Sequence, residues 1–297
     1  VCALGLENEL VGISHECDFP ASIKNLPVCT SPKFRTDVSS KEIDQSVFNL
    51  VKNGLSVYEV NTPLLDSLAP DFIVTQSQCE VCAVNFKDVE EAVCHIVSSS
   101  PNIINLEPND LKDVFRDIQT VANALGKHEA GQTLIKEYEE RVEHIKSILF
   151  QSQNLKKPSV ATIEWIDPLM FAANWIPEMI DIAGGINVFG EAGKHSHYFQ
   201  WEELLKADPD IILVLPCGFD IERCLEEMAL ITSKPRYSEL KAVKNGKVFV
   251  TNGNEYFNRP GPRIVDSIEI MAEIFHPSLF PQKYADAYIN FSESVPV

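Results

Sequence analysis

"LLDSLAPDFIV", residues 64–74, returns later in the chain as "ELLKADPDIILV", residues 203–214. In both stretches a helical pattern of apolar residues stops at a Pro-Asp pair, and an apolar strand pattern follows at once. Proline lacks the N–H group that a helix interior needs, so it ends the helix and directs the chain into a sheet. The recurrence predicts one helix–strand unit that is used twice, which favours two similar halves.

Strand and helix patterns alternate along the rest of the chain as well. Short apolar runs predict strands, and the amphipathic stretches between them predict helices. This order is typical of an α/β protein with mainly parallel sheets. The predicted strands cover residues 10–14, 71–75, 102–106, 159–164, 210–215 and 247–251.

A long amphipathic segment, residues 127–153, separates the two copies of the repeated unit. About 20 residues of helix span about 30 Å, enough to join two lobes as a stiff rod. We therefore expect an N-terminal lobe over 1–126, a connecting helix over 127–153 and a C-terminal lobe over 154–297. The alternative is that this helix lies flat on one larger domain. Its apolar stripe consists of Leu134, Tyr138, Val142, Ile145 and Leu149.

The charge balance excludes some partners. The chain of 297 residues carries 25 Lys and Arg against 43 Asp and Glu, a net charge of -18. Such a charge repels phosphate backbones and anionic lipid surfaces, so we expect no nucleic-acid partner. The apolar runs are also shorter than the roughly 20 residues that a membrane helix requires. The composition predicts a globular protein, which we expect to be a monomer, rather than an integral membrane protein.

The segments that follow the predicted strands carry the candidate site. In open parallel sheets, ligands bind beyond the carboxyl ends of the strands. In the first half these segments read "SHECDFP" (14–20) and "QSQCEVC" (76–82), and in the second half "WIDP" (165–168) and "NGNEYFNRP" (252–260). Aromatic rings with a few polar groups are the usual lining of a small-molecule pocket. We therefore predict one cleft between the halves.

Cys79 and Cys82 have the spacing of half a zinc site. A structural zinc ion needs four ligands, so His15 and Cys17 would have to complete the set. A redox pair would need a helix N-terminus or a basic neighbour to lower the thiol pKa, and no basic residue adjoins the pair. We favour a role for the two cysteines in the wall of the pocket. A disulfide between them is the alternative if the compartment is oxidising.

Catalytic motifs are absent from the sequence. No Gly-x-Ser-x-Gly elbow, Walker loop or Gly-x-Gly-x-x-Gly motif follows a predicted strand. We therefore do not expect an enzyme. The rival hypothesis is a metal-ion carrier or a metal-dependent enzyme that uses His and Cys ligands at the same cleft.

Three further stretches, taken with the repeated unit and the middle helix, resemble a known family over nearly the whole chain. They are "VGISHECDFP" (11–20), "WIPEMIDIAGG" (175–185) and "YFNRPGPRIVD" (256–266). The family is the helical-backbone (class III) substrate-binding proteins of ABC importers, in particular the branch that binds cobalamin and iron chelates.

The resemblance implies a periplasmic-binding-protein-like fold, with two lobes rigidly joined by one helix. It implies a corrinoid (cobalamin) or an iron chelate as cargo, no separate cofactor or protein-bound metal, and an ABC permease as partner. A periplasmic or extracytoplasmic location follows from the family. Eight cysteines and no visible signal peptide leave the cytoplasm as the alternative.

The resemblance also places ligand-binding residues. The family's first-lobe contact falls at Glu16 and Cys17, and its second-lobe aromatic falls at Tyr256. Aromatic rings are expected to sandwich the cargo, while Glu and Arg side chains orient its polar periphery, where the arginine fork suits carboxylates and carboxamides. The predicted ligand-binding set is Glu16, Cys17, Cys79, Cys82, Trp165, Trp175, Glu255, Tyr256, Phe257 and Arg259.

Overall fold

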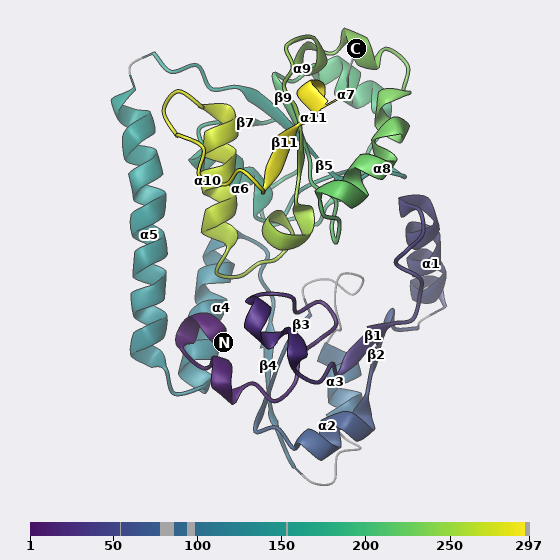
Figure 1. The fold of residues 1–297 in the computed structure, drawn as a ribbon, viewed down its shortest axis with the longest axis vertical. Coiled ribbons are helices and arrows are strands. Elements are labelled where there is room, and N and C mark those ends of the chain that lie inside the picture. Colours follow the sequence, from purple (N-terminus) through teal and green to yellow (C-terminus); the bar gives the residue numbers. More distant parts are fainter. Residues whose placement is uncertain (54, 78–85, 94–98, 153, 295–297) are drawn as a thin grey trace. The chain divides into compact units, whose positions relative to one another are not determined.

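The computed structural model describes residues 1–53, 55–77, 86–93, 99–152 and 154–294 (Figure 1). The chain divides into two compact units. Unit 1 consists of Val1–Pro108 and Phe115–Lys136, and unit 2 consists of Asn109–Val114 and Glu137–Val297. Each unit combines helices with strands, so the predicted α/β class is confirmed.

The described residues of unit 1 form two small sheets. Strands β3 and β4 pair in parallel, from Phe72 opposite Asn102 to Gln76 opposite Leu106, while β1 and β2 pair antiparallel. Two apolar clusters hold these sheets and their helices together, one around Ile104 and one around Val57. The elements are β1 (Thr30–Pro32), α1 (Ser40–Lys52), β2 (Tyr58–Val60), α2 (Thr62–Leu68), β3 (Phe72–Gln76), α3 (Phe86–Val93) and β4 (Asn102–Leu106).

The strand predicted over residues 10–14 is wrong. Within the described residues this segment makes one isolated parallel bridge, between Ile13 and Val28. The Ile13 N–H donates to the Pro27 carbonyl at 2.9 Å, and the Cys29 N–H donates to the Ile13 carbonyl at 2.8 Å. Because Pro27 has no N–H to donate, the ladder cannot extend past it.

The repeated helix–strand unit is confirmed in its backbone geometry. Helices α2 and α7 (Trp201–Ala207) each end at a residue in the left-handed region, Ala69 with φ 45° and Asp208 with φ 42°. A proline follows in both cases, and the strands β3 and β9 (Ile211–Val214) begin two residues after it. Residues other than glycine rarely adopt this backbone conformation, because it brings the Cβ atom close to the following carbonyl oxygen. Both copies therefore pass from helix to strand through the same strained backbone turn.

Unit 2 is built on a seven-stranded mixed sheet. Its strand order is β11-β10-β9-β5-β6-β8, and β7 also pairs with β5. The neighbours β10, β9 and β5 run parallel, whereas β11, β6 and β8 add antiparallel edges. Every residue of β9 and β10 is buried, as expected for strands that are covered on both faces. Helices α6 and α10 lie on one side of this sheet and α8 lies on the other (Figure 1).

The predicted strands of the second half agree with β5, β9 and β10 to within one residue at each end. The remaining elements of unit 2 complete the sheet and its covering helices. Their bounds are β5 (Ser159–Trp165), β6 (Met170–Phe171), α6 (Ile176–Ile182), β7 (Ile186–Asn187), β8 (His197–Tyr198), α8 (Ile221–Thr232), α9 (Lys241–Lys244), β10 (Val248–Thr251), α10 (Ile264–Phe275), β11 (Tyr288–Asn290) and α11 (Phe291–Ser294).

Two helices contribute residues to both units. They are α4 (Leu111–Ala124) and α5 (His128–Gln151). Helix α5 covers residues 128–151 of the predicted connecting segment, and Tyr138 and Ile145 of its apolar stripe are buried. The lobe boundaries at 1–126, 127–153 and 154–297 stay a prediction. Within the described ranges, no helix combines the length and the apolar character needed to cross a membrane.

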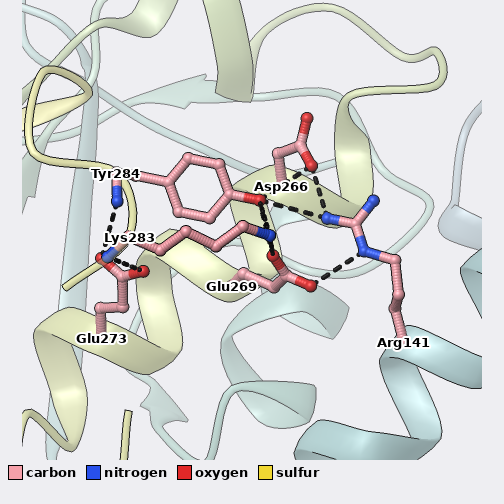
Figure 2. A network of polar contacts seen from close by, with 6 residues as sticks. All are labelled: Arg141, Asp266, Glu269, Glu273, Lys283 and Tyr284. Carbon is pink, nitrogen blue, oxygen red and sulfur yellow. Dashed lines mark hydrogen bonds and ion pairs between the residues drawn. The ribbon is translucent and has the colours of Figure 1, made fainter. Parts of the chain in front are cut away.

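A polar network holds α5 against α10 inside unit 2 (Figure 2). Arg141 on α5 pairs with Asp266 at 2.5 Å and with Glu269 at 2.9 Å. The Tyr284 hydroxyl donates to Glu269 at 2.5 Å and accepts from Arg141 at 3.2 Å, and Lys283 pairs with Glu269 at 2.8 Å. Burial alone would raise the pKa of Glu269, but the hydrogen bonds from Arg141, Lys283 and Tyr284 lower it to about 2.

Candidate functional site

The carboxyl ends of β5, β9 and β10 lie side by side, because these parallel strands are neighbours in the sheet. We call the segments at these ends, residues 164–168, 215–220 and 252–259, the unit 2 edge. Ligands of open α/β sheets bind at such an edge, where the loops and helix N-termini face outward. Six predicted ligand-binding residues lie on these segments or beside them: Trp165, Trp175, Glu255, Tyr256, Phe257 and Arg259.

The segment after β10 forms a π-helical turn over Gly253–Phe257. This turn sits on the segment after β9, because the Asn254 N–H donates to the Phe219 carbonyl at 3.0 Å and the Asn258 amide donates to the Leu215 carbonyl at 2.8 Å. A Cβ atom at Gly253 would lie 2.3 Å from the Pro216 carbonyl oxygen, so only glycine allows this approach. Single π-turns occur frequently at functional sites.

Trp175 and Phe257 lie in the core of unit 2, with exposed fractions of 5% and 0%. The Trp175 indole N–H donates to the Phe257 carbonyl at 2.9 Å. This bond joins the start of α6 to the end of the π-turn. The two buried residues therefore fix the position of the π-turn on the core of unit 2.

Tyr256 lies in the π-turn and is partly buried. Its ring meets the Tyr284 ring edge-on, with centroids 6.3 Å apart, and the Arg263 guanidinium lies 5.6 Å from the Tyr256 centroid. Burial and the nearby carboxylate of Glu255 raise the pKa of Tyr256, so its hydroxyl stays protonated at neutral pH. The Arg259 guanidinium donates to the Asn254 side chain at 2.7 Å.

Trp165 ends β5 and is also partly buried. Its ring lies 5.3 Å from the Phe219 ring at an angle of 53°. The indole nitrogen is buried and has no hydrogen-bond partner in the part of the chain that the structure describes. A buried donor without a partner costs about 1–3 kcal/mol, so an acceptor at this N–H would stabilise the edge.

Glu164 precedes Trp165 and is the carboxyl group of this edge whose pKa is clearly shifted. It accepts a hydrogen bond from the Ser196 hydroxyl at 2.6 Å. Burial raises the pKa of Glu164 to about 7, although the bonds from Ser196 and the Ala173 backbone oppose the shift. The site therefore holds a carboxyl group that changes charge near neutral pH.

Phe219 was missed by the sequence reasoning, although the strand-end rule applies to β9 as well. It follows the strand after Cys217-Gly218 and is 4% exposed. The Arg223 guanidinium lies 4.4 Å from its ring centroid. Reading the residues after residue 215 would have added this ring to the candidate set.

In unit 1, the segment Ser14–Asp18 carries the predicted residues Glu16 and Cys17, and we call it the unit 1 edge. Cys17 has an exposed thiol, and its N–H donates to the Ser14 carbonyl at 3.0 Å. The Glu16 side chain is 46% exposed. Cys79 and Cys82, the other two predicted residues of this half, lie outside the described residues.

His15 lies between Ser14 and Glu16 and belonged only to the metal alternative in the sequence reasoning. Its Nδ1 atom lies 2.7 Å from the Thr30 hydroxyl oxygen, and its ring centroid lies 5.1 Å from that of Tyr58. The Nε2 atom is buried without a hydrogen bond and lies 3.5 Å from a Glu16 carboxylate oxygen. Burial lowers the pKa of His15, while Glu16 acts in the opposite direction.

The metal alternative depends on the cysteines. Among the residues that the structure describes, no group of three or more His, Cys, Asp or Glu side chains is placed to hold a metal ion. Because Cys79 and Cys82 are outside that part, the predicted His15–Cys17–Cys79–Cys82 set stays a hypothesis. A cavity of about 300 Å³ lies elsewhere, at the amino-terminal edge of the unit 2 sheet, beside Lys156, Pro158 and Lys247.

The sequence matches a family model. The model is that of the periplasmic binding proteins, and it matches residues 1–255. The vitamin B12-binding protein of Vibrio cholerae is 21% identical over 174 residues, which are 56% of this chain and 57% of that protein. The match therefore spans little more than half the length of this relative. The uncharacterized ABC transporter substrate-binding lipoprotein YvrC of Bacillus subtilis is 19% identical over 94% of this chain and 77% of its own length.

Solved structures of similar fold cover almost the whole chain. The periplasmic vitamin B12-binding protein BtuF of Vibrio cholerae superimposes with a TM-score of 0.63 at 18% identity, covering 95% of this chain and 93% of that one. A periplasmic heme-binding protein from Pseudomonas aeruginosa gives a TM-score of 0.68 at 17% identity, covering 95% of this chain and 90% of that one. These structures share the fold described above.

Proposed function

The chain belongs to the periplasmic binding protein family, and we propose that it binds a corrinoid such as cobalamin, or an iron chelate, as the cargo of an ABC importer. Its similarity to the vitamin B12-binding protein of Vibrio cholerae supports this cargo class. Both kinds of cargo are large molecules that hold their metal in a chelate. We infer that the protein binds and releases the cargo without chemical change.

The observation that carries this proposal is the buried indole N–H of Trp165 on the unit 2 edge, which has no hydrogen-bond partner among the described residues. The partly buried Trp165 ring packs there on the buried Phe219 ring, and the neighbouring π-turn adds Tyr256. Flat rings suit the apolar face of a macrocycle, and the indole N–H suits a carboxylate or carboxamide on its periphery. The edge thus offers both kinds of contact that such a cargo requires.

The predicted site residues take different roles in this proposal. We assign Trp165 and Tyr256 to direct contact with the cargo, and Trp175 and Phe257 to holding the π-turn that presents Tyr256. Glu255 and Arg259 would orient the polar groups of the cargo. In the first half, Glu16 and Cys17 are proposed as ligand-binding residues of unit 1, and Cys79 and Cys82, which lie outside the described residues, as wall residues.

The proposal extends to partner and location. Substrate-binding proteins of ABC importers deliver their cargo to a membrane permease, which we propose as the partner. A periplasmic or extracytoplasmic location follows from this role, and we propose that the protein acts there as a monomer. The B. subtilis lipoprotein supports this view, since its name combines substrate binding with an ABC transporter.

A desalting experiment tests the function. The protein is incubated separately with cyanocobalamin and with haemin, passed through a desalting column, and examined by absorbance. We expect the corrin or the porphyrin absorbance to stay with the protein at a ratio near one cargo per chain. Two colourless samples, combined with one equivalent of tightly held zinc by elemental analysis, would support the metal-ion carrier instead.

A further inference from the structure

A cavity lies at the end of the unit 2 sheet that is opposite the unit 2 edge. The segments that precede β5, β9 and β10 meet there, because these parallel strands are neighbours and begin side by side. They border the cavity of about 300 Å³ described above, which we call the basic cavity. Its volume lies at the lower end of the range for small-molecule pockets, so it suits a small ligand.

Part of the lining of the basic cavity is apolar. Pro158 precedes β5, Ile211 begins β9, and Phe275 ends α10, and all three line the cavity. Ile211 and Phe275 are 3% and 7% exposed, so they belong to the core of unit 2 as well. Apolar side chains of this kind contact the hydrocarbon part of a ligand.

Two lysines give the basic cavity its positive charge. Lys156 is exposed, Lys247 is half-buried, and both line the cavity. The neighbouring Lys157 pairs with Asp181 at 3.2 Å, whereas neither Lys156 nor Lys247 forms an ion pair within the described ranges. An ammonium group is a compact charge with three donors, which suits the oxygens of a phosphate or a carboxylate.

Asp210 also lines the basic cavity, but its carboxylate already has partners. It accepts from the Ser159 N–H and from the Ser159 hydroxyl, both at 2.9 Å, and it pairs with Lys241. Because Lys241 balances the charge of Asp210, the positive charges of Lys156 and Lys247 remain in excess. The chain as a whole carries a net charge of -18, so this cavity is a local site of attraction for anions on an acidic protein.

The backbone around the basic cavity is anchored in the sheet. The Lys247 N–H donates to the Ala242 carbonyl at 2.7 Å, and the Lys247 carbonyl accepts from the Ile212 N–H at 3.0 Å. On the other side, the Pro158 carbonyl accepts from the Ile186 N–H at 2.8 Å. A ligand that binds between these segments therefore has little backbone to order, which reduces the cost of binding.

We propose that the basic cavity binds a small organic dianion with an apolar body. The two ammonium groups hold the anionic oxygens, and Pro158, Ile211 and Phe275 contact the apolar body. The Asn245 side chain also lines the cavity, and its amide can donate a further hydrogen bond. A phosphate monoester and a dicarboxylate share this chemistry. The site does not depend on the proposed function, because it lies at the far end of β5, β9 and β10 from the unit 2 edge.

Isothermal titration calorimetry tests the proposal and distinguishes the two sources of the dianion. Phenyl phosphate and phthalate are titrated separately into the protein. Inorganic phosphate, which lacks the apolar body, and benzyl alcohol, which lacks the charge, are the comparison probes. We expect phenyl phosphate or phthalate to bind one per chain and at least about tenfold more tightly than either comparison probe, because only the dianions use both parts of the lining.

Substitution of the lysines locates the site. Lys156→Gln and Lys247→Gln should each weaken binding of the preferred dianion at least about fivefold, since each removes one charged donor from a partly exposed site. Lys244→Gln is the matched control, because Lys244 is an exposed lysine that precedes the same strand without lining the cavity. The control should bind within about twofold of the parent.

Acetylation of the lysines, read by mass spectrometry, gives a second readout. Saturation with the preferred dianion should slow the acetylation of Lys156 and Lys247 and leave that of Lys244 unchanged. The proposal is overturned if neither dianion binds at millimolar concentration, or if neither binds more tightly than inorganic phosphate. It is also overturned if Lys244→Gln weakens binding as much as the other two variants, or if saturation protects none of the lining lysines.

Discussion

Glu164 is a buried carboxyl group at the candidate site with a raised pKa. Burial raises its pKa from 4.5 to about 7. Because the folded state binds this proton more tightly than the unfolded state does, its contribution to stability is complete below about pH 4.5. That contribution is lost as the pH rises toward 7 and beyond, at a cost of up to about 3 kcal/mol.

We therefore expect Glu164→Gln to be more stable relative to the parent at about pH 8 than at about pH 4, since the amide keeps an acceptor for Ser196 and carries no charge. Urea unfolding of both proteins at the two pH values measures this. Glu139→Gln, an exposed position on α5, serves as the control and should show no such dependence. An equal difference in stability at both pH values would contradict the buried-carboxyl interpretation.

Tyr256 tests the aromatic contact with the cargo. Removing its ring in Tyr256→Ala should weaken cargo binding about tenfold, which corresponds to about 1.4 kcal/mol. Tyr256→Phe keeps the ring and should bind within about twofold of the parent. Absorbance titration with the cargo retained in the desalting experiment gives the two dissociation constants. Parent-like binding by Tyr256→Ala would remove Tyr256 from the site.

Residue types at the site were predictable from sequence, but burial was not. Trp175 and Phe257 were predicted to bind the ligand, and nothing local indicated the hydrogen bond that joins them across 82 positions. The same limit applies to His15, because its partners Thr30 and Tyr58 come from β1 and β2. The sequence pattern predicts which aromatic residues lie at the edge of the sheet. Tertiary contacts decide which of their rings are exposed.

At the scale of elements, the two corners before β3 and β9 make a matched pair. Ala69 is exposed and has φ 45°, a conformation that glycine adopts more readily than alanine, so Ala69→Gly should stabilise the protein by about 1 kcal/mol. The Asp208 carboxylate accepts from the Lys241 N–H at 2.7 Å and so caps α9. Asp208→Gly loses this cap, worth about 1 kcal/mol, and should give no net gain. Urea unfolding measures both, and an equal gain at the two corners would contradict this reasoning.

The network between α5 and α10 makes a second prediction about elements. Arg141→Ala leaves Asp266 and Glu269 without their guanidinium partner and should destabilise the protein by about 2 kcal/mol, a value reduced for the partial exposure of the pairs. Lys146→Ala, which removes an exposed pair with Glu143 on the same helix, should cost less than about 0.5 kcal/mol. Thermal unfolding of the two variants checks the contrast. Similar losses in both would mean that the network contributes no more than a surface pair.

Elements with a strong local pattern were predictable, and those that depend on distant pairing were not. Buried strands such as β9 and β10 are apolar runs bounded by turns, so their sequence alone identifies them. The two-residue strands β6, β7 and β8 carry no such pattern, because only pairing within the sheet defines them. The strand prediction for residues 10–14 failed for the opposite reason. The apolar pattern of a strand was present, but Pro27 limited the pairing.

At the scale of the whole molecule, we expect low pH to destabilise the folded state of unit 2. Burial works against both shifts, but Lys241 and Ser159 lower the pKa of Asp210 to about 2, and Arg141 and its neighbours lower that of Glu269 to about 2. Carboxyl groups with lowered pKa values stabilise the folded state above their unfolded values of 3.8 and 4.5, and this stabilisation is lost as the pH falls toward 2.

We expect the free energy of unfolding to decrease between about pH 5 and pH 2, and to decrease less in Arg141→Ala, where Glu269 has lost its main partner. Urea unfolding followed by far-ultraviolet circular dichroism across this range measures both slopes. Identical slopes in the parent and the variant would show that the network does not shift the titration of Glu269.

All three tryptophans, Trp165, Trp175 and Trp201, belong to unit 2. Intrinsic fluorescence therefore reports on that unit alone, and unit 1 is silent in emission excited at the indole band. The Trp165 ring at the proposed cargo edge would transfer its excitation energy to a bound porphyrin or corrin. Cargo binding would therefore quench the tryptophan fluorescence. A melt followed by emission and by dichroism together would thus distinguish the order in which the two units open.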